Sequence, residues 1–94
     1  MQSNSEEFFK RLHDELEQTS TWPSEYLFKF IVKSEINKIV EIKNNFDNLG
    51  AVIKTGASKN GNYTSISVNV VMENPDEVIK KYLDVSHIEG IISL

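Results

Sequence analysis

The chain has 94 residues, of which 39% are hydrophobic and 26% charged, and its formal net charge is −4. This length fits one two-layer domain and excludes two. Because cysteine is absent, disulfides and thiolate metal sites are excluded. The acidic balance argues against DNA as a partner, since DNA phosphates require clustered cations. No apolar run approaches the roughly 20 residues that span a bilayer, and the first residues lack a signal-peptide pattern. We therefore expect a cytoplasmic protein without membrane contact.

Residues 4–18 have the pattern of an amphipathic helix. Asn4 and Glu7 have capping-box spacing at its start. One apolar stripe runs along it at helical spacing, formed by Phe8, Phe9, Leu12 and Leu16. Pro23 interrupts the pattern and favours extended backbone at Trp22. We expect residues 1–21 to form an appended helix and hinge, and residues 22–94 to form the main domain.

A strand is predicted over residues 26–32, which are rich in aromatic and β-branched side chains. Successive side chains of a strand point to opposite faces. The bulkier set without a charge should face the helices, namely Tyr26, Phe28, Phe30 and Val32. The other set should face outward, namely Leu27, Lys29 and Ile31.

The next predicted helix covers residues 35–49, with Ser34 as its cap and Gly50 just beyond its end. Its predicted buried stripe consists of Ile36, Ile39, Val40, Phe46 and Leu49. Ile42 is predicted to lie at the margin of this stripe. A weaker strand is predicted over residues 51–58. Gly56 within it indicates a bulge or a close backbone approach.

Asn60-Gly61 between two strand patterns predicts a two-residue type I′ hairpin, in which both residues have positive φ. The following strand, residues 63–72, alternates between two kinds of face. Its apolar face contains Ile66, Val68, Val70 and Met72. Its largely polar face contains Ser65, Ser67, Asn69 and Val71. This alternation is typical of a sheet that is covered on one side.

The clearest helix start lies at Asn74, which is followed by Pro75 at the first helical position and Glu77 at the third. The predicted buried stripe of this helix is Val78, Ile79, Tyr82, Leu83 and Val85. A short last strand is predicted over residues 90–94. The full order, β-α-β-β-α-β, predicts an α+β ferredoxin-like sandwich. Its four-stranded antiparallel sheet would have the order 4-1-3-2, with two helices on one face and an extra N-terminal helix.

Several short motifs in this order resemble the YbeD-like family of small bacterial proteins of unknown function. They are Trp22-Pro23 before Phe28-Lys29-Phe30, the hairpin from Ser58 to Ser65, Asn74-Pro75-Asp76-Glu77, and the segment from Ile88 to Leu94. The resemblance covers roughly residues 22–94. It implies a ferredoxin-like fold similar to ACT domains, which are small-molecule-sensing regulatory modules. It brings no catalytic residues to this chain.

The residue types of common active sites are sparse. His13 and His87 are the only histidines, and neither has a cysteine or a second histidine at metal-ligand spacing. The carboxylates fall mainly on helix faces and first turns, where solvation or capping explains them. Acylphosphatases share the predicted fold, but Arg11 in the appended helix is the only arginine. We therefore expect no enzyme activity, no catalytic residue, no metal and no cofactor.

The outward sheet face is too apolar to be left bare and too polar to be a core. We therefore predict an interaction surface formed by Leu27, Lys29, Ile31, Ser65, Ser67, Asn69, Phe8, Phe9, Leu12 and Leu16. Lys29 has three roles open to it: binding an anionic ligand, reaching water, or pairing with a carboxylate of the appended helix. That helix itself could pack on its own sheet, on a second chain in a homodimer, or on another protein.

These features favour a non-catalytic regulatory or protein-interaction module that binds a protein partner or itself. The alternative is an ACT-type sensor of a small molecule such as an amino acid, with its ligand near Gly50 and the ends of the first and third strands. RNA binding is less favoured. Lys59, Gly61 and Tyr63 faintly match the start of an RNA-binding strand, but a single aromatic makes a weak stacking platform.

Overall fold

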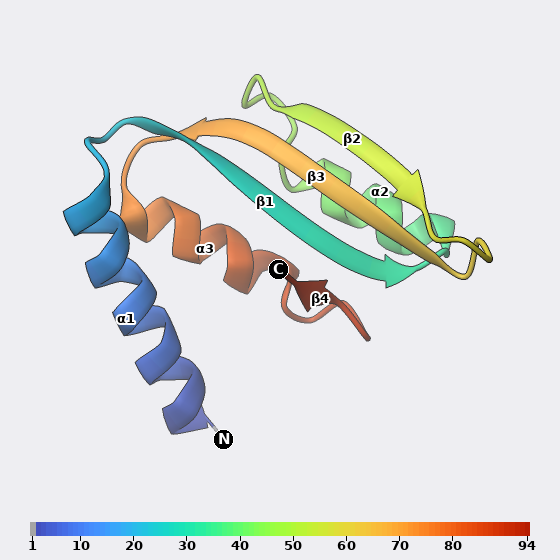
Figure 1. Ribbon diagram of the computed structural model, residues 1–94, viewed down its shortest axis with the longest axis horizontal. Coiled ribbons are helices and arrows are strands. Elements are labelled where there is room, and N and C mark those ends of the chain that lie inside the picture. Colours follow the sequence, from blue (N-terminus) through green and yellow to red (C-terminus); the bar gives the residue numbers. More distant parts are fainter. Residues whose placement is uncertain (1) are drawn as a thin grey trace.

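The structure is a computed structural model that describes residues 2–94, with side chains described from Glu6 onward. It is an α+β arrangement of three helices and a four-stranded antiparallel sheet with the strand order β2-β3-β1-β4 (Figure 1). Read from the other edge, this is the predicted order. The elements are α1 (Gln2–Thr19), β1 (Ser24–Lys33), α2 (Ile36–Asn44), β2 (Val52–Ala57), β3 (Tyr63–Met72), α3 (Pro75–Val85) and β4 (Ile92–Ser93).

The longest ladder joins β1 and β3, which pair in antiparallel register from Ser24 opposite Met72 to Lys33 opposite Tyr63. Because side chains alternate along each strand, one face of this ladder carries almost all the bulky apolar residues. That face and the helices enclose the core, whose fully buried members on the sheet are Phe28, Phe30, Val32, Ile66 and Val68. The predicted inner faces of both strands are confirmed.

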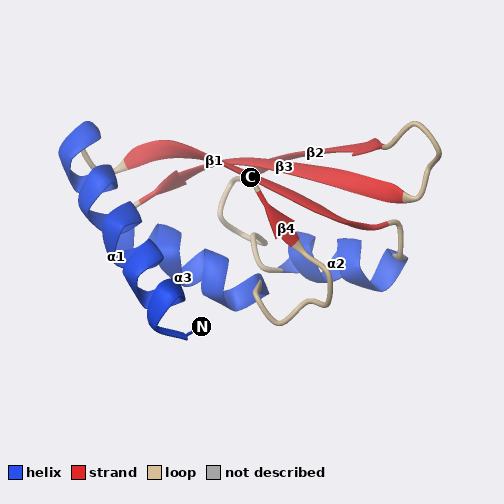
Figure 2. Ribbon diagram, turned by 60° about the horizontal axis from the view of Figure 1, so that its bottom comes forward, coloured by secondary structure: helices blue, strands red, loops and turns tan. Residues whose placement is uncertain are grey.

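All three helices lie on the same side of the sheet (Figure 2). The predicted start of α3 is confirmed, because the Glu77 backbone N–H donates a hydrogen bond of 2.9 Å to Asn74 Oδ1. Val78 and Val85 are buried beneath the sheet. Leu83, which was predicted to be buried, is 52% exposed because it lies on the side of α3 that faces away from the sheet.

Helix α2 is shorter than predicted, and its buried stripe is different. The helix starts after Glu35 rather than Ser34, whose hydroxyl instead hydrogen-bonds to that of Thr64 at 2.7 Å. At about 3.6 residues per turn, Ile39 and Ile42 share one narrow arc of the helix, and Phe46 in the turn that follows lies in line with them. Ile42 is fully buried, not marginal. The predicted burial is wrong for three residues that lie outside this arc or beyond the helix end, namely Ile36, Val40 and Leu49.

The β2–β3 hairpin differs from the two-residue turn that Asn60-Gly61 predicts. The backbone N–H of Ser58 donates to the Tyr63 carbonyl at 2.8 Å, and that of Gly61 donates to the Ser58 carbonyl at 2.9 Å. The loop therefore has four residues, 59–62. Of the two central residues only Gly61 has a positive φ, at +76°. The strands close one residue pair earlier because Ser58 Oγ also accepts the Tyr63 N–H.

Gly56 does not form a bulge, since the pairing runs without interruption from Val52 opposite Asn69 to Ala57 opposite Thr64. The alternative prediction, a close approach, is confirmed. A Cβ at Gly56 would lie 3.3 Å from Ser65 Oγ, which also donates a hydrogen bond to the Gly56 carbonyl.

Strand β4 is shorter than the predicted residues 90–94. It pairs with β1 only at Ile92 opposite Ile31 and Ser93 opposite Phe30, and the Leu94 N–H donates to the Lys29 carbonyl at 2.9 Å. Gly90 belongs to the preceding turn and has a φ of +77°. The turn absorbs part of the predicted strand because Ile88 is held in the core.

Helix α1 begins at Gln2, so Asn4 lies within its first turn and the predicted cap is wrong. The end of the helix is joined to the domain by Trp22 Nε1, which donates a hydrogen bond of 3.1 Å to the Leu16 carbonyl. His13 Nε2 lies 3.1 Å from Asp76 Oδ1 at the start of α3. The helix thus packs beside α3 and leaves the opposite sheet face bare (Figure 2). Within residues 2–94, no helix combines the length and apolarity that crossing a bilayer requires.

Candidate functional site: the open sheet face

The sheet has one face that none of the described helices covers (Figure 2). Strand alternation and register place its outward side chains in rows across the strands. We call this surface the open sheet face. It consists of Glu25, Leu27, Lys29 and Ile31 from β1, Val52 and Lys54 from β2, and Ser65, Ser67, Asn69 and Val71 from β3.

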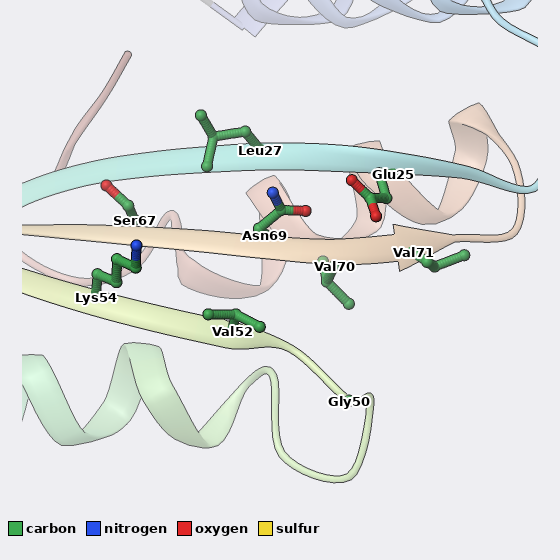
Figure 3. Close-up of a pocket in the computed structure, with 9 residues that line it drawn as sticks. All are labelled: Glu25, Leu27, Gly50, Val52, Lys54, Ser67, Asn69, Val70 and Val71. Atoms are coloured by element: carbon green, nitrogen blue, oxygen red, sulfur yellow. The ribbon is translucent and has the colours of Figure 1, made fainter.

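The centre of the open sheet face is apolar. Leu27, Val52 and Val71 are exposed by 56%, 58% and 56%, respectively. Together with Gly50 and Asn69 they line a hollow of about 340 Å³ (Figure 3). Aliphatic side chains normally contribute to a core when a strand is half buried, and here three of them surround a polar amide instead.

Charged side chains lie on both sides of this apolar centre. Lys29 of β1 and Lys54 of β2 both occupy the positions opposite Ser67, so one row of the sheet carries two cations. Glu25 lies two residues before Leu27 in β1, at the other end of the hollow. Figure 3 shows Asn69 between Glu25 and Lys54. The face therefore has a basic row, an apolar centre and an acidic end.

The ten residues predicted to form one interaction surface divide into two groups on opposite sides of the sheet. Leu27, Lys29, Ile31, Ser65, Ser67 and Asn69 come together on the open sheet face. The four residues of α1 lie on the helix side, where Leu16 packs against the core. Because α1 lies there, its carboxylates do not reach Lys29, and the predicted pairing of Lys29 within one chain is ruled out.

The remaining residues of α1 border a second hollow of about 440 Å³, between α1, α3 and β4. We call it the α1 groove. Phe8, Phe9 and Leu12 line it from one side, and Tyr26 and Tyr82 from the other. The rings of Phe9 and Tyr82 are 6.5 Å apart between centroids. The predicted apolar stripe thus faces a groove that α1 forms with its own domain.

Sequence reasoning missed Val52, Lys54 and Glu25 as members of the site. The signal that finds them is register: once β2 is aligned with β3, Val52 falls opposite Asn69 and Lys54 opposite Ser67. The Asn60-Gly61 pattern already predicts this register, because a two-residue loop and the observed four-residue loop both place Val52 opposite Asn69. A one-residue slip would place each of these side chains on the other face.

Each of the two histidines contacts a carboxylate of a separate element. His13 lies 3.1 Å from Asp76 of α3 and 3.5 Å from Asp14. His87, after α3, contacts Glu41 of α2. His13, Asp14 and Glu17 are close enough to offer three ligand atoms within 4.8 Å of one another, but the two carboxylates are exposed. Such pairs on a surface hold helices together weakly.

The pKa of the Tyr82 phenol is raised far above its ordinary value, first by burial and then by the hydrogen bond to Tyr26 and its charge. The two hydroxyl oxygens are 2.8 Å apart. Both rings pack around Phe28, at centroid distances of 4.7 Å for Tyr26 and 5.2 Å for Tyr82. Tyr82 is therefore a neutral hydroxyl at the wall of the α1 groove.

Comparison with known proteins gives one match. The model of a family described as protein of unknown function (DUF493) matches residues 17–94. No curated protein and no solved structure matches the chain. The matched segment includes the last residues of α1, every strand of the sheet, and both α2 and α3. The chain belongs to the DUF493 family of proteins of unknown function.

Proposed function

We propose that this chain is a non-catalytic interaction module that binds a protein partner, or a second copy of itself, through the open sheet face. The observation that carries the proposal is the exposure of Leu27, Val52 and Val71, each more than half accessible, around one hollow. Burial of apolar surface is favourable by roughly 25 cal/mol per Å². A partner that covers this centre gains that free energy without unfolding any part of the domain.

The distribution of charge also supports a protein partner. Protein interfaces commonly have an apolar centre and a polar rim. Here Lys29 and Lys54 form one side of the rim and Glu25 the other. Rim charges of opposite sign orient a partner and select against others, more than they add affinity. The open sheet face therefore favours a partner whose own apolar patch has an acidic and a basic end.

A regulatory role further rests on the class of fold. We assign the chain to the ferredoxin-like, ACT-like class, in agreement with its resemblance to YbeD-like proteins. The order β1-α2-β2-β3-α3-β4 with sheet order β2-β3-β1-β4 supports this assignment, because each helix connects two strands that are separated by a third. Fold alone does not determine function, so the open sheet face carries the proposal.

A small-molecule sensor is the second candidate, and the hollow itself favours it. Its volume of about 340 Å³ lies within the range of roughly 300–1,000 Å³ for small-molecule sites. Gly50 and the ends of β1 and β3 border it, which is where an ACT-type ligand is expected. Glu25 and Lys54 supply the two charges that complement an amino acid's ammonium and carboxylate groups. RNA binding has less support, because Tyr63, the aromatic residue expected to stack on a base, is the first residue of β3 and does not line this hollow.

Two nearly isosteric variants test the main proposal: Val52→Thr and Val71→Thr on the open sheet face, with Val40→Thr on α2 as the matched control, since Val40 is also exposed. Each tagged variant is compared with the wild type for proteins captured from a native lysate and for mass by light scattering. We expect both sheet variants to lose captured partners or self-association, while the control retains them.

Retention of the same partners by all variants, together with a strictly monomeric wild type, would contradict the interaction proposal. A thermal-shift series with the free amino acids separates the second candidate. A ligand that binds only the folded state raises the melting temperature, and Val71→Thr should reduce that shift. A flat series, with loss of captured proteins by the sheet variants, supports the interaction module alone.

A further inference from the structure

One edge of the sheet is only partly occupied. β3 pairs with all ten residues of β1 on one side. On the other side β4 pairs only with Phe30 and Ile31, and Leu94 adds one hydrogen bond to Lys29. Among the residues that the structure describes, no strand pairs with this outer edge between Ser24 and Phe28. Half of β1 is thus an edge strand and the other half is not.

Antiparallel geometry identifies the backbone groups that point outward here. Residues along such a strand direct their N–H and C=O groups alternately to one neighbour and the other. Because the Leu94 N–H donates to the Lys29 carbonyl, Lys29 directs its groups toward β4. Leu27 and Glu25 therefore direct theirs to the free edge. The Glu25 carbonyl has a weak contact of 3.4 Å with Ser24 Oγ. Such a row is a template for a further strand.

The α1 groove lies on the helix side of the same edge. The side chain of Tyr26 projects from β1 into its wall, and Leu94 at the end of β4 also borders it. The residues that line the groove include no charged side chain. The hydroxyls of Tyr26 and Tyr82 supply one polar point. An apolar hollow therefore adjoins the unpaired backbone.

We propose that this edge binds an extended peptide segment of a partner protein, which pairs with β1 in line with β4 and inserts alternate apolar side chains into the α1 groove. Addition of a strand to a free edge is a common form of peptide recognition, in which backbone hydrogen bonds give affinity and pockets give specificity. The site consists of the backbone edge and the α1 groove and shares only the Glu25 side chain with the hollow of the open sheet face, and it does not depend on the function proposed above.

Register defines the chemistry of the segment. Residues opposite Phe28 and Tyr26 point to the helix side, so they should be apolar. The residue opposite Glu25 points to the other side, where a lysine or arginine complements the carboxylate. The net charge of −4 on the chain also favours a positively charged segment. The segment runs in the same direction as β4, from the position opposite Phe28 to the position opposite Glu25. In that direction its four residues should be apolar, variable, apolar and basic.

A second copy of this chain complements the same vacancy less well. The free stretch begins at Phe28, next to Leu94, and ends at Ser24. A parallel copy of β1 would run along the line that β4 occupies. An antiparallel copy centred on Tyr26 would avoid β4, but it would place the copy's Leu27 opposite Glu25 and bring together two chains that each carry a net charge of −4. A separate segment can instead place a basic residue opposite Glu25.

The probe is the blocked peptide acetyl-Val-Thr-Val-Lys-Val-amide, titrated into the full ¹⁵N-labelled chain. We expect shifts of the backbone amides of Leu27, Glu25 and Leu12, and slower hydrogen exchange at Leu27 when peptide is bound. Because Glu25 is exposed, its charge can be reversed without disturbing the core. Glu25→Lys should weaken binding of this peptide by about two- to fivefold, which is the effect of losing an exposed ion pair. The same peptide with Glu in place of Lys should then bind the variant better than the wild type. The control Val40→Thr should bind like the wild type.

Three results would overturn the inference. They are no amide shift at any peptide concentration, shifts confined to Val52 and Lys54, or peptide affinities that are the same for the wild type and Glu25→Lys with both the lysine and the glutamate peptide. The second of these would place the peptide on the open sheet face. Slow exchange at Leu27 without peptide, with a mass that rises with protein concentration, would show that a second copy covers the edge. Loss of peptide binding leaves the lysate capture by the open sheet face unaffected, so the two proposals fail separately.

Discussion

Adjacent residues Leu27 and Phe28 allow a direct comparison of the two sheet faces. We expect Phe28→Ala to be strongly destabilising and Leu27→Ala only weakly so, although the residues are neighbours in β1. Phe28 is fully buried and packs against Phe46 and Tyr82 at centroid distances of 5.0 and 5.2 Å. Leu27 is 56% exposed on the open sheet face.

The magnitudes follow from these environments. Truncation of a buried phenylalanine to alanine lowers the free energy of unfolding by about 3–5 kcal/mol, because a cavity adds to the lost transfer free energy. Full burial of a leucine contributes about 1.5–3 kcal/mol. Since less than half of Leu27 is removed from water, Leu27→Ala should cost about 1 kcal/mol. A domain of this size has roughly 5–15 kcal/mol in total, so a stability near the middle of that range leaves both variants folded.

The assay is urea unfolding followed by circular dichroism, at two protein concentrations that differ widely. The slope m should be unchanged, so that the shift in midpoint reports stability. Phe28→Ala should lower the midpoint about three to five times as much as Leu27→Ala. Equal shifts would refute the assignment of the two faces. A loss for Leu27→Ala that grows with protein concentration would show that a second copy covers this face.

Three further changes test local features. Asn74→Ala removes the cap of Glu77 and should lower the free energy of unfolding by about 1 kcal/mol; an unchanged urea midpoint would contradict the cap. Gly61→Ala places a Cβ at a φ of +76° and should cost about 1–2 kcal/mol, whereas Gly61→Asn should cost less; equal midpoints for the two variants would contradict the left-handed turn. In the wild type the folded state holds the Tyr82 proton after the unfolded chain has lost it, so stability should fall as pH rises past about 10. Tyr82→Phe should show a shallower fall in urea midpoints across this range, and a fall as steep as that of the wild type would contradict the burial of the phenol.

The features that could be predicted from sequence are those in which neighbouring residues carry the whole signal. The alternation of Phe28 and Phe30 with Leu27 and Lys29 depends only on strand geometry, and the structure confirms it. The cap at Asn74 is equally local, because the cap and the donor are three residues apart. The strand order followed from these elements, since a helix between two strands leaves few arrangements.

The errors occur where a distant contact decides the conformation. Residues 36–49 could be assigned to a stripe in two ways, and the burial of Ile42 together with the packing of Phe46 against Phe28 and Phe30 selects the one that was not predicted. Ser34 was predicted to cap the helix, but its hydroxyl contacts that of Thr64 of β3 instead. The short β4 follows from the burial of Ile88 in the core.

The site was half predictable for the same reason. The outward residues of β1 and β3 could be identified from alternation alone. The contribution of β2 follows from the register that Asn60-Gly61 predicts, whereas the position of α1 required its contacts with Asp76 and Trp22. Those contacts place α1 on the helix side, so its apolar stripe was assigned to the wrong surface.

Hydroxyl-radical footprinting tests the central claim most directly. The chain is labelled alone at low concentration, and again in complexes recovered after cross-linking in cells. We expect Leu27, Val52 and Val71 to be modified in the isolated chain and protected in the complexes, while buried Ile66 and Val68 are protected in both. Protection of Leu27, Val52 and Val71 in the isolated monomer, or equal modification in both samples, would contradict the account of the open sheet face as the binding surface.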